Sequence, residues 1–308
     1  MVNFNETQLI RWMKLSRVKG LGPRKIQSLA EFFGSIDKIF EATPTELVSA
    51  RVFKEGMLPE WRQLKDASDE NFVKVIRECA SQNIKIMPLL DEAYPLKLKR
   101  LPAPPLTLFL LGDASLLNSD KIAVVGTRQP SEKARKLAFD FAKYFADQRI
   151  TVVSGGAEGI DSAAHEGALA SGVGKTVCVL GSGFFKSYPS KNESLFERIR
   201  KSGGLLVSEH LPNFPGSSIS LIQRNRITSG LSDALLVCAS KEAGGSMIQT
   251  KIALEQRIPI FCPSLSLDVQ PNEGIRIAIT DFGAREVNSP QELLSKIKDA
   301  PKSLQQYL

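Results

Sequence analysis

Apolar positions recur at helical spacing through the N-terminal part of the chain, which contains few strand-like runs. The pattern is interrupted at 19–23 by Lys-Gly-Leu-Gly-Pro, which predicts helices at 9–18 and 24–33 on either side of a turn. The run Thr-Pro-Thr-Glu at 43–46 is typical of a helix start, with threonine as the N-cap and glutamate as its capping-box partner. A further amphipathic helix is predicted over 69–81.

From residue 121 onward, short apolar runs alternate with helical segments. The candidate strands are 122–126, 151–156, 176–181, 205–209, 234–239 and 258–262. We expect the last of these to close the series. The helix expected after Ser131 has an apolar face made of Ala134, Leu137, Ala138, Phe141, Ala142 and Phe145. Continuous apolar strands with helices on both sides predict a parallel sheet that is covered on two faces. The expected fold class is α/β, with a Rossmann-like doubly wound, mostly parallel sheet.

These patterns predict four segments along the chain. A small helical domain is expected over 1–95, and a Pro-rich linker with a short strand over 96–120. The run Leu-Pro-Ala-Pro-Pro at 101–105 fixes φ and removes hydrogen-bond donors, so we expect an extended, semi-rigid connection there. The Rossmann-like domain is expected over 121–290, followed by a C-terminal helix and tail over 291–308.

Composition narrows the classes of protein to consider. The 308 residues are 43% hydrophobic and 24% charged, which argues against a disordered or fibrous chain. No uncharged apolar stretch approaches about 18 residues, so we expect no membrane-spanning helix. The first residues lack the hydrophobic region of a secretory signal, and we therefore expect a cytoplasmic protein. The net charge of +7 favours a polyanionic partner.

The cysteines and histidines indicate no metal chemistry. The four cysteines are far apart and form no Cys-x-x-Cys pair, so we expect buried, reduced thiols. With two histidines and no Cys/His cluster, we expect no metal site. We also expect no cofactor and assign no catalytic residue.

Small residues and positive charge follow three of the predicted strands. The three loops consist of Gly126, Thr127 and Arg128; of Ser154, Gly155, Gly156, Ala157, Glu158 and Gly159; and of Gly181, Ser182 and Gly183. Ligands of open α/β sheets bind beyond the carboxyl ends of the strands, and glycines let backbone N–H groups approach an anion there. The helix expected after Gly159 would add its positive N-terminus. The alternative is three tight turns without a ligand.

Two further segments are candidate anion-binding sites. Arg224, Asn225 and Arg226 precede a helix-like run, and two arginines beside an asparagine can contact phosphates and a base or sugar. Gly245 and Ser246 open another helix and offer one more set of backbone amides. The alternative for the arginine segment is a solvated run of charge.

Asp161 and His165 lie four residues apart just after the second glycine loop, so they share a helix face. A catalytic pair is conceivable, but a carboxylate at a phosphate-binding helix end would repel the phosphate. We therefore favour a structural hydrogen bond that orients His165 or the loop. His210 has no visible partner and is expected at the surface or in a loop.

In their order along the chain, these motifs resemble the DprA/Smf family of bacterial DNA-processing proteins. The matching segments are Gly126-Thr127-Arg128, Ser154-Gly155-Gly156-Ala157-Glu158-Gly159-Ile160-Asp161 with His165, Gly181-Ser182-Gly183, Tyr188-Pro189-Ser190-Lys191-Asn192, Ser208-Glu209, Arg224-Asn225-Arg226 with Ser229-Gly230-Leu231-Ser232, and Gly244-Gly245-Ser246. The resemblance implies a protein that binds single-stranded DNA in natural transformation, protects it and loads RecA recombinase onto it. It also implies a homodimer formed through the Rossmann-like domain.

The resemblance gives the segment 1–95 an identity as a SAM-like helical domain. The stretch 18–23 is in addition similar to a helix-hairpin-helix, whose backbone amides can hold a phosphate. A simple turn between two helices is the alternative interpretation of this stretch.

The chain departs from the family pattern at several places. Leu221-Ile222 replaces a usual Phe-Pro pair, Cys262-Pro263-Ser264 replaces Val-Pro-Gly, and Gly274-Ile275-Arg276 lacks an asparagine that is often found near that turn. The chain also ends about where a winged-helix module begins in many members, so we expect it to lack that module and any duplex binding by it.

The expected mechanism is sequence-independent binding of a strand through its phosphates. Arg128, Lys191, Arg224 and Arg226 would line one pocket together with the loop amides. The candidate partners for base stacking are Phe184, Phe185 and Tyr188, for which core packing is the alternative.

Two other functions stay open at this point. The glycine loops also resemble those of Rossmann enzymes that cleave nucleoside monophosphates, for which Glu158, Asp161 or Glu209 would be the required carboxylate. The other is a nucleotide-sensing scaffold that makes no contact with DNA.

Overall fold

The computed structural model describes residues 4–298, and the chain divides into two units between Phe109 and Leu110. This division falls inside a strand, β2 (Thr107–Gly112), which continues the Pro-rich segment. The domain boundaries at 95 and 120 stay predictions. The tail after residue 298, which closes the predicted segment 291–308, lies outside the described residues.

The N-terminal unit is built mainly from helices, as the periodicity predicts. They are α1 (Glu6–Leu15), α2 (Pro23–Phe33), α3 (Ile36–Glu41), α4 (Pro44–Ser49), α5 (Leu58–Asp66), α6 (Glu70–Ser81) and α7 (Leu96–Lys99), and they are joined by a single strand, β1 (Ile84–Pro88), before β2. The predicted capping box is confirmed, since the Thr43 side chain accepts from the Glu46 amide and the Glu46 side chain accepts from the Thr43 amide. Helices α3 and α5 are not evident from the sequence pattern because each is short or weakly apolar.

The turn between α1 and α2 bears on the helix-hairpin-helix interpretation. Gly20 has a φ of 78°, which only glycine adopts without strain. The Lys19 amide donates to Glu60 Oε2 at 3.0 Å, so a carboxylate of the chain itself already occupies one amide of this turn. This contact favours the simple turn between two helices.

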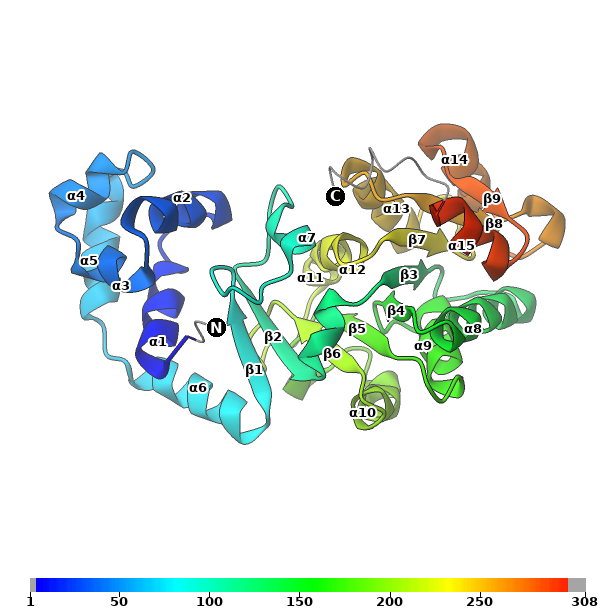
Figure 1. Ribbon diagram of the computed structural model, residues 1–308, viewed down its shortest axis with the longest axis horizontal. Helices are drawn as coiled ribbons and strands as arrows, with labels where there is room; N and C mark the ends of the chain where they lie inside the picture. Colours follow the sequence, from blue (N-terminus) through cyan, green and yellow to red (C-terminus); the bar gives the residue numbers. More distant parts are fainter. Residues whose placement is uncertain (1–3, 299–308) are drawn as a thin grey trace. The chain divides into compact units, whose positions relative to one another are not determined.

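The C-terminal unit contains a parallel sheet with helices on both faces (Figure 1). Its strands are β3 (Lys121–Val125), β4 (Thr151–Ser154), β5 (Thr176–Leu180), β6 (Leu205–Ser208), β7 (Ala234–Val237), β8 (Ile260–Pro263) and β9 (Arg285–Val287). Each strand from β3 to β9 pairs in parallel with its neighbours in the order β6-β5-β4-β3-β7-β8-β9. The expected fold class is confirmed. The expectation that 258–262 closes the series is wrong, because the three-residue strand β9 follows; it is too short to show a periodic signal.

The helices of this unit cover the two faces in separate groups. They are α8 (Glu132–Asp147), α9 (Ile160–Ala170), α10 (Glu193–Lys201), α11 (Ser218–Gln223), α12 (Asn225–Gly230), α13 (Gly245–Glu255), α14 (Glu273–Phe282) and α15 (Pro290–Lys298). Helices α8, α9 and α15 pack on one face of the sheet, and α12 and α13 lie across it on the other (Figure 1). The Ser289 hydroxyl accepts from the Glu292 amide at 3.2 Å and so caps the start of α15.

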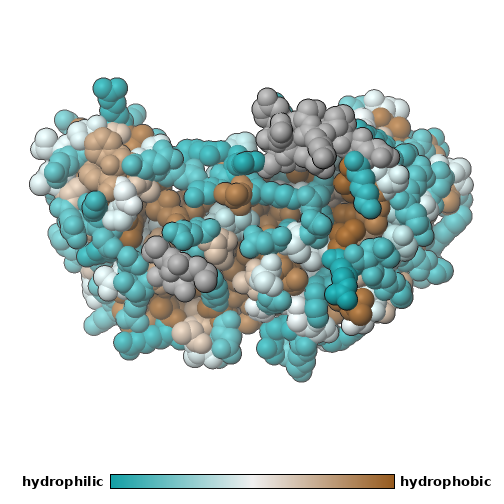
Figure 2. Space-filling view, in the orientation of Figure 1, coloured by the Kyte–Doolittle hydropathy of each residue, from teal (hydrophilic) through white to brown (hydrophobic). Residues whose placement is uncertain are grey.

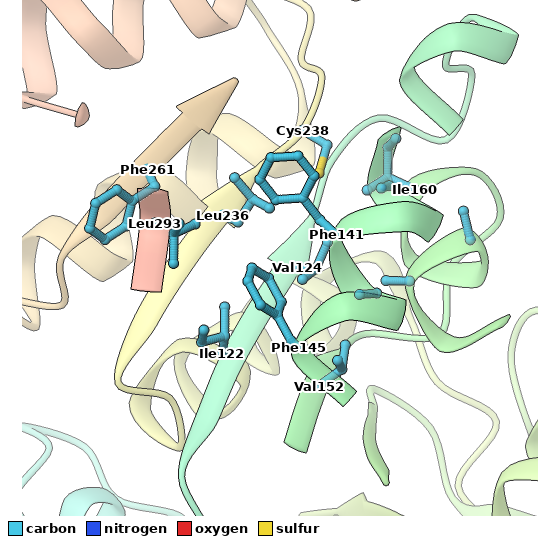
Figure 3. Packing of buried hydrophobic residues seen from close by; sticks show 14 of the residues in the cluster. Ile122, Val124, Phe141, Phe145, Val152, Ile160, Leu236, Cys238, Phe261 and Leu293 are labelled. Atoms are coloured by element: carbon cyan, nitrogen blue, oxygen red, sulfur yellow. The ribbon is translucent and has the colours of Figure 1, made fainter. Parts of the chain in front are cut away.

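The core of the C-terminal unit lies between α8 and the sheet. Phe141 and Phe145 of α8 pack over Ile122 and Val124 of β3 (Figure 3). Val124 is fully buried and Ile122 nearly so, as expected for a parallel sheet with both faces covered. All four cysteines are buried and form no disulfide, which confirms the expected burial of these side chains.

The order of the strands locates a switch point. From β3 the chain proceeds through β4, β5 and β6 in one direction, and from β7 through β8 and β9 in the other. The direction therefore reverses between β3 and β7, and the helices after these two strands diverge to opposite faces. This arrangement leaves a crevice at the carboxyl ends of β3 and β7, where doubly wound proteins bind their ligands.

Figure 2 shows a largely hydrophilic surface on the viewed face, with hydrophobic residues in separate patches. Within residues 4–298, no helix is both long and apolar enough to cross a bilayer.

Candidate functional site

A cavity of about 610 Å³ opens at the switch point between β3 and β7. It is lined by the loop after β3, the start of α9, Tyr188, the segment 215–225 and the first turns of α13. The Thr127 amide donates to Ala239 O at 2.9 Å and so joins the ends of the two strands. A Cβ at Gly126 would lie 2.6 Å from Ile160 Cγ1, so only glycine lets the strand end pack this closely against α9.

Arg224 lies buried beneath the cavity, where its side chain is part of the lining. It is 5% exposed, and its Nη1 donates to Val179 O at 2.6 Å. Its buried Nε has no hydrogen-bond partner among the described residues. A Cβ at Gly155 would lie 1.7 Å from Arg224 Nη1, so this glycine makes room for the guanidinium. A buried arginine keeps its charge, so this cation beneath the cavity favours an anionic ligand.

Two exposed cations add to this charge. Arg128 follows β3 and lines the cavity, and its guanidinium has no hydrogen bond or ion pair within residues 4–298. Lys241 follows β7, and within the described residues its ammonium group donates only to the Gln129 amide oxygen, at 3.3 Å, a neutral partner that leaves its charge uncompensated. The cavity therefore combines one buried and two exposed cations.

The N-terminus of α13 also faces the cavity. The N-cap is Gly244, which supplies no side-chain cap, and the first turn contains no acidic residue. The amides of Gly245 and Ser246 have no acceptor in the described part of the chain, and both residues line the cavity. The uncapped end of an eleven-residue helix directs its partial positive charge at the cavity.

The glycine loop after β4 is arranged differently. The Ala157 amide donates to Asp161 Oδ2 at 3.3 Å, so an acid in the first turn of α9 holds the loop that precedes its own helix. The Asn192 side chain donates to Gly156 O at 2.9 Å and to the Ser162 hydroxyl at 2.9 Å, which holds the loop in place. The positive N-terminus expected at the start of α9 therefore has an acid, Asp161, in its first turn.

Asp161 and His165 do not form a catalytic pair. Nδ1 of His165 lies 2.8 Å from the Thr176 hydroxyl, which itself donates to Val152 O, so Nδ1 carries the proton. Burial, with a smaller effect of the Arg224 charge, lowers the pKa of His165 to about 3. Burial raises the pKa of Asp161, against the effects of Arg224 and of the hydrogen bonds from the loop. The expected structural role of Asp161 in orienting the loop is confirmed; its role in orienting His165 is not.

The third glycine loop lies outside the cavity. The Gly183 amide donates to Phe214 O at 2.8 Å, and a Cβ on Gly183 would come within 2.2 Å of Leu211 O. Ser182 is fully buried, and its hydroxyl accepts from the Tyr188 amide at 3.1 Å. A Cβ at Gly181 would lie 2.9 Å from Leu221 Cα. These glycines allow the segment before α11 to pack on the sheet and are not part of the anion-binding lining.

Several other candidates are also occupied or turned away. Nη1 and Nη2 of Arg226 each donate to an oxygen of the Glu209 carboxylate at 2.6 Å, so these nitrogens are not available to the cavity. Lys191 is exposed outside the lining, and its Nζ lies 3.6 Å from Glu158 Oε2.

The aromatic candidates separate by burial. Phe184 is buried in the core, which corrects its assignment as a stacking partner, and Phe185 is partly exposed outside the lining. Tyr188 is half exposed and lines both the cavity and a smaller hollow beside Arg128. His210 lies in the loop after β6, as expected, but it has a partner, since its ring stacks on Phe214 with 4.3 Å between centroids.

The structure thus brings together part of the site expected from the sequence. The lining contains Gly126, Thr127, Arg128, Ala157, Tyr188, Arg224, Asn225, Gly245 and Ser246, with Gly155 in the smaller hollow. It leaves out Ser154, Gly156, Gly159, Gly181, Ser182, Gly183, Phe184, Phe185, Lys191 and Arg226.

Sequence reasoning missed Lys241 and two isoleucines, Ile222 and Ile248, that line the cavity. The position of Lys241 just after β7 is the signal that could have identified it. Within residues 4–298, no group of three or more His, Cys, Asp or Glu side chains is placed to hold a metal ion.

Comparisons with known proteins agree with this architecture. Residues 85–298 match the model of the family described as DNA recombination-mediator protein A. Protein Smf of Synechocystis sp. is 31% identical over 294 residues, covering 94% of this chain and 73% of that protein.

Two solved structures are similar over most of their length. The X-ray structure of DNA processing protein A from Streptococcus pneumoniae has a TM-score of 0.76 at 27% identity, covering 96% of this chain and 99% of that one. DNA processing protein A from Helicobacter pylori, described in a structural study of its single-stranded DNA binding mode, has a TM-score of 0.62 at 25% identity and covers 70% of this chain and 97% of that one. The family model covers more than half of the chain and similar relatives cover most of it, so this chain belongs to the DNA recombination-mediator protein A family, also called DprA/Smf.

Proposed function

We propose that this chain binds single-stranded DNA in the cavity between β3 and β7. Phosphates of the strand are held by the guanidinium groups of Arg128 and Arg224, the ammonium group of Lys241 and the free amides of Gly245 and Ser246. These contacts are to the backbone of the strand, so binding is independent of sequence.

The observation that carries the proposal is the convergence of Arg128, Arg224 and Lys241 on one cavity, beside the open start of α13. Among the described residues of this lining, Asp161 is the only acid, so three cations face one carboxylate. The balance of charge in the cavity therefore favours an anion.

The family relationship supports a finer proposal. The bound strand is protected and RecA recombinase is loaded onto it, by a homodimer of this chain in the cytoplasm. Sedimentation equilibrium tests the dimer, nuclease digestion of a labelled strand tests protection, and the rate of DNA-dependent ATP hydrolysis by RecA tests loading.

Fluorescence anisotropy of labelled poly-dT at several salt concentrations tests binding in the cavity. Three cationic side chains predict a slope of log K against log salt of about −2, at roughly −0.7 for each phosphate contact on a single strand. Arg128→Ala is expected to weaken binding and to reduce the slope by about 0.7.

Arg135→Ala is the matched control, because Arg135 is exposed on α8, outside the lining. It is expected to bind like the wild type. Equal losses in the two variants, or tight binding that Arg128→Ala leaves unchanged, would place the strand elsewhere. An absence of binding at low salt would contradict the proposal and favour the nucleoside monophosphate enzyme, which release of free base would reveal.

A further inference from the structure

The lining of the cavity contains an apolar part that phosphate binding does not use. Ile222 of α11 and Ile248 of α13 are 41% and 38% exposed, and both line the cavity. The two helices contact each other, and both side chains line the same cavity. Neither isoleucine lines the smaller hollow beside Arg128 and Tyr188.

Exposed apolar side chains in a concave site indicate contact with an apolar part of a ligand. The free amide of Gly245 and the side chain of Ile248 are three residues apart on α13, so they lie on the same face, about 4.5 Å apart along the helix axis. A single nucleotide has the same division, with a charged phosphate at one end and a flat, largely apolar base at the other.

We infer that Ile222 and Ile248 form a base-contacting wall, on which a base of the bound strand packs while its phosphate lies at the start of α13. This inference rests on the proposed binding of single-stranded DNA and adds the orientation of the strand, with the bases toward α11 and α13. Aliphatic side chains make dispersion contacts with the face of any base and offer no hydrogen-bond pattern, so the wall does not select a sequence.

The arrangement separates two contributions to affinity. The cations and amides act on phosphates and are weakened by salt, whereas the isoleucines act on bases and are not. A strand that keeps its phosphates but lacks its bases therefore distinguishes them.

The experiment compares oligo-dT with an abasic oligonucleotide of the same length, both labelled, in anisotropy titrations. Ile222→Ala and Ile248→Ala are each expected to weaken oligo-dT binding about fivefold, which is ~1 kcal/mol at 1.4 kcal/mol per tenfold change. Their affinity for the abasic strand and their salt slope should equal those of the wild type. Arg128→Ala should weaken binding of both strands.

Matched controls lie on the same two helices. Ile219 of α11 and Leu254 of α13 are 66% and 46% exposed but do not line the cavity, so Ile219→Ala and Leu254→Ala should bind both strands like the wild type. Melting temperatures of all four variants confirm that they are folded.

The outcomes separate this inference from the function on which it rests. If the wild type binds both strands but the two wall variants leave oligo-dT affinity unchanged, or weaken both strands equally, the wall is wrong and phosphate binding stands. If the wild type binds neither strand, the proposed function fails, and the wall fails with it.

Discussion

The loop after β4 and the first turn of α13 are similar in sequence, since each combines glycines with the start of a helix, yet they differ in what their amides bind. In α9 the first turn contains Asp161, which accepts from the Ala157 amide. In α13 the first turn has no acid, and the amides of Gly245 and Ser246 stay open to the cavity. One helix start is satisfied internally and the other is left for a ligand.

The glycines of the two segments also differ in how closely the rest of the chain approaches them. A Cβ at Gly159 would lie 2.5 Å from Thr127 O, whereas a Cβ at Gly245 would have no atom within 4 Å. The first glycine is required by the packing of the chain, and the second leaves room for something outside it. Glycines at strand ends therefore indicate close approach, but of the protein's own backbone in one case and of a ligand in the other.

The largest expected effect is the loss of unfolding free energy when Gly159 is replaced by alanine, compared with the same substitution at Gly245. Gly159 has a φ of 85°, so Gly159→Ala adds left-handed strain to a backbone clash and is expected to cost about 3 kcal/mol of unfolding free energy. Gly245→Ala should change it by less than about 0.5 kcal/mol. Urea denaturation followed by circular dichroism measures both. Similar losses in the two variants would show that the segments do not differ in packing.

The next effect concerns His165, an ionisable group buried within α9. The pKa of His165 is about 3 in the folded protein against 6.5 for the free side chain, so below pH 6.5 the unfolded chain binds a proton that the folded chain does not. Stability is therefore lost as the pH falls from 6.5 toward 3, by about 2 kcal/mol between pH 7 and pH 5.

Urea denaturation at pH 7 and pH 5 tests this dependence. Burial also lowers the pKa of His210, so both histidines contribute with the same sign. His165→Asn is expected to be less stable at pH 7 but to lose less on acidification, and His210→Asn serves as the control for the other histidine. A wild-type pH dependence in His165→Asn would contradict the assignment.

The smallest effect comes from placing an acid in the first turn of α13, as α9 has in Asp161. Gly245→Asp places a carboxylate in the first turn of α13, where it raises the unfolding free energy by up to about 0.5 kcal/mol. The same charge repels a phosphate, so the affinity for poly-dT is expected to fall about tenfold.

Gly245→Asn has nearly the same shape without the charge and is the control. It should keep most of the binding in the anisotropy titration. If the aspartate and asparagine variants bind equally, the start of α13 is not a phosphate contact.

Most of the fold and about half of the site could be predicted because their signals are local. Apolar runs such as 122–126 and the amphipathic face of the helix after Ser131 depend only on neighbouring residues, and they predicted β3 and α8. Strand β9 escaped because three residues with one buried apolar side chain carry no period. The position of Arg128 at a strand end and that of Gly245 at a helix start followed from the same local patterns.

By itself the sequence determined the alternation of strands and helices, the glycines at the strand ends and the excess of positive charge. Only the tertiary structure decided which of these groups are open to a ligand. The Gly183 amide donates to Phe214 O, and the Arg226 guanidinium pairs with the Glu209 carboxylate. Arg224 lies beneath the cavity, and its Nε has no partner among the described residues. The reason is that secondary structure follows from nearby residues, whereas the exposure of a donor depends on distant segments that fold over it.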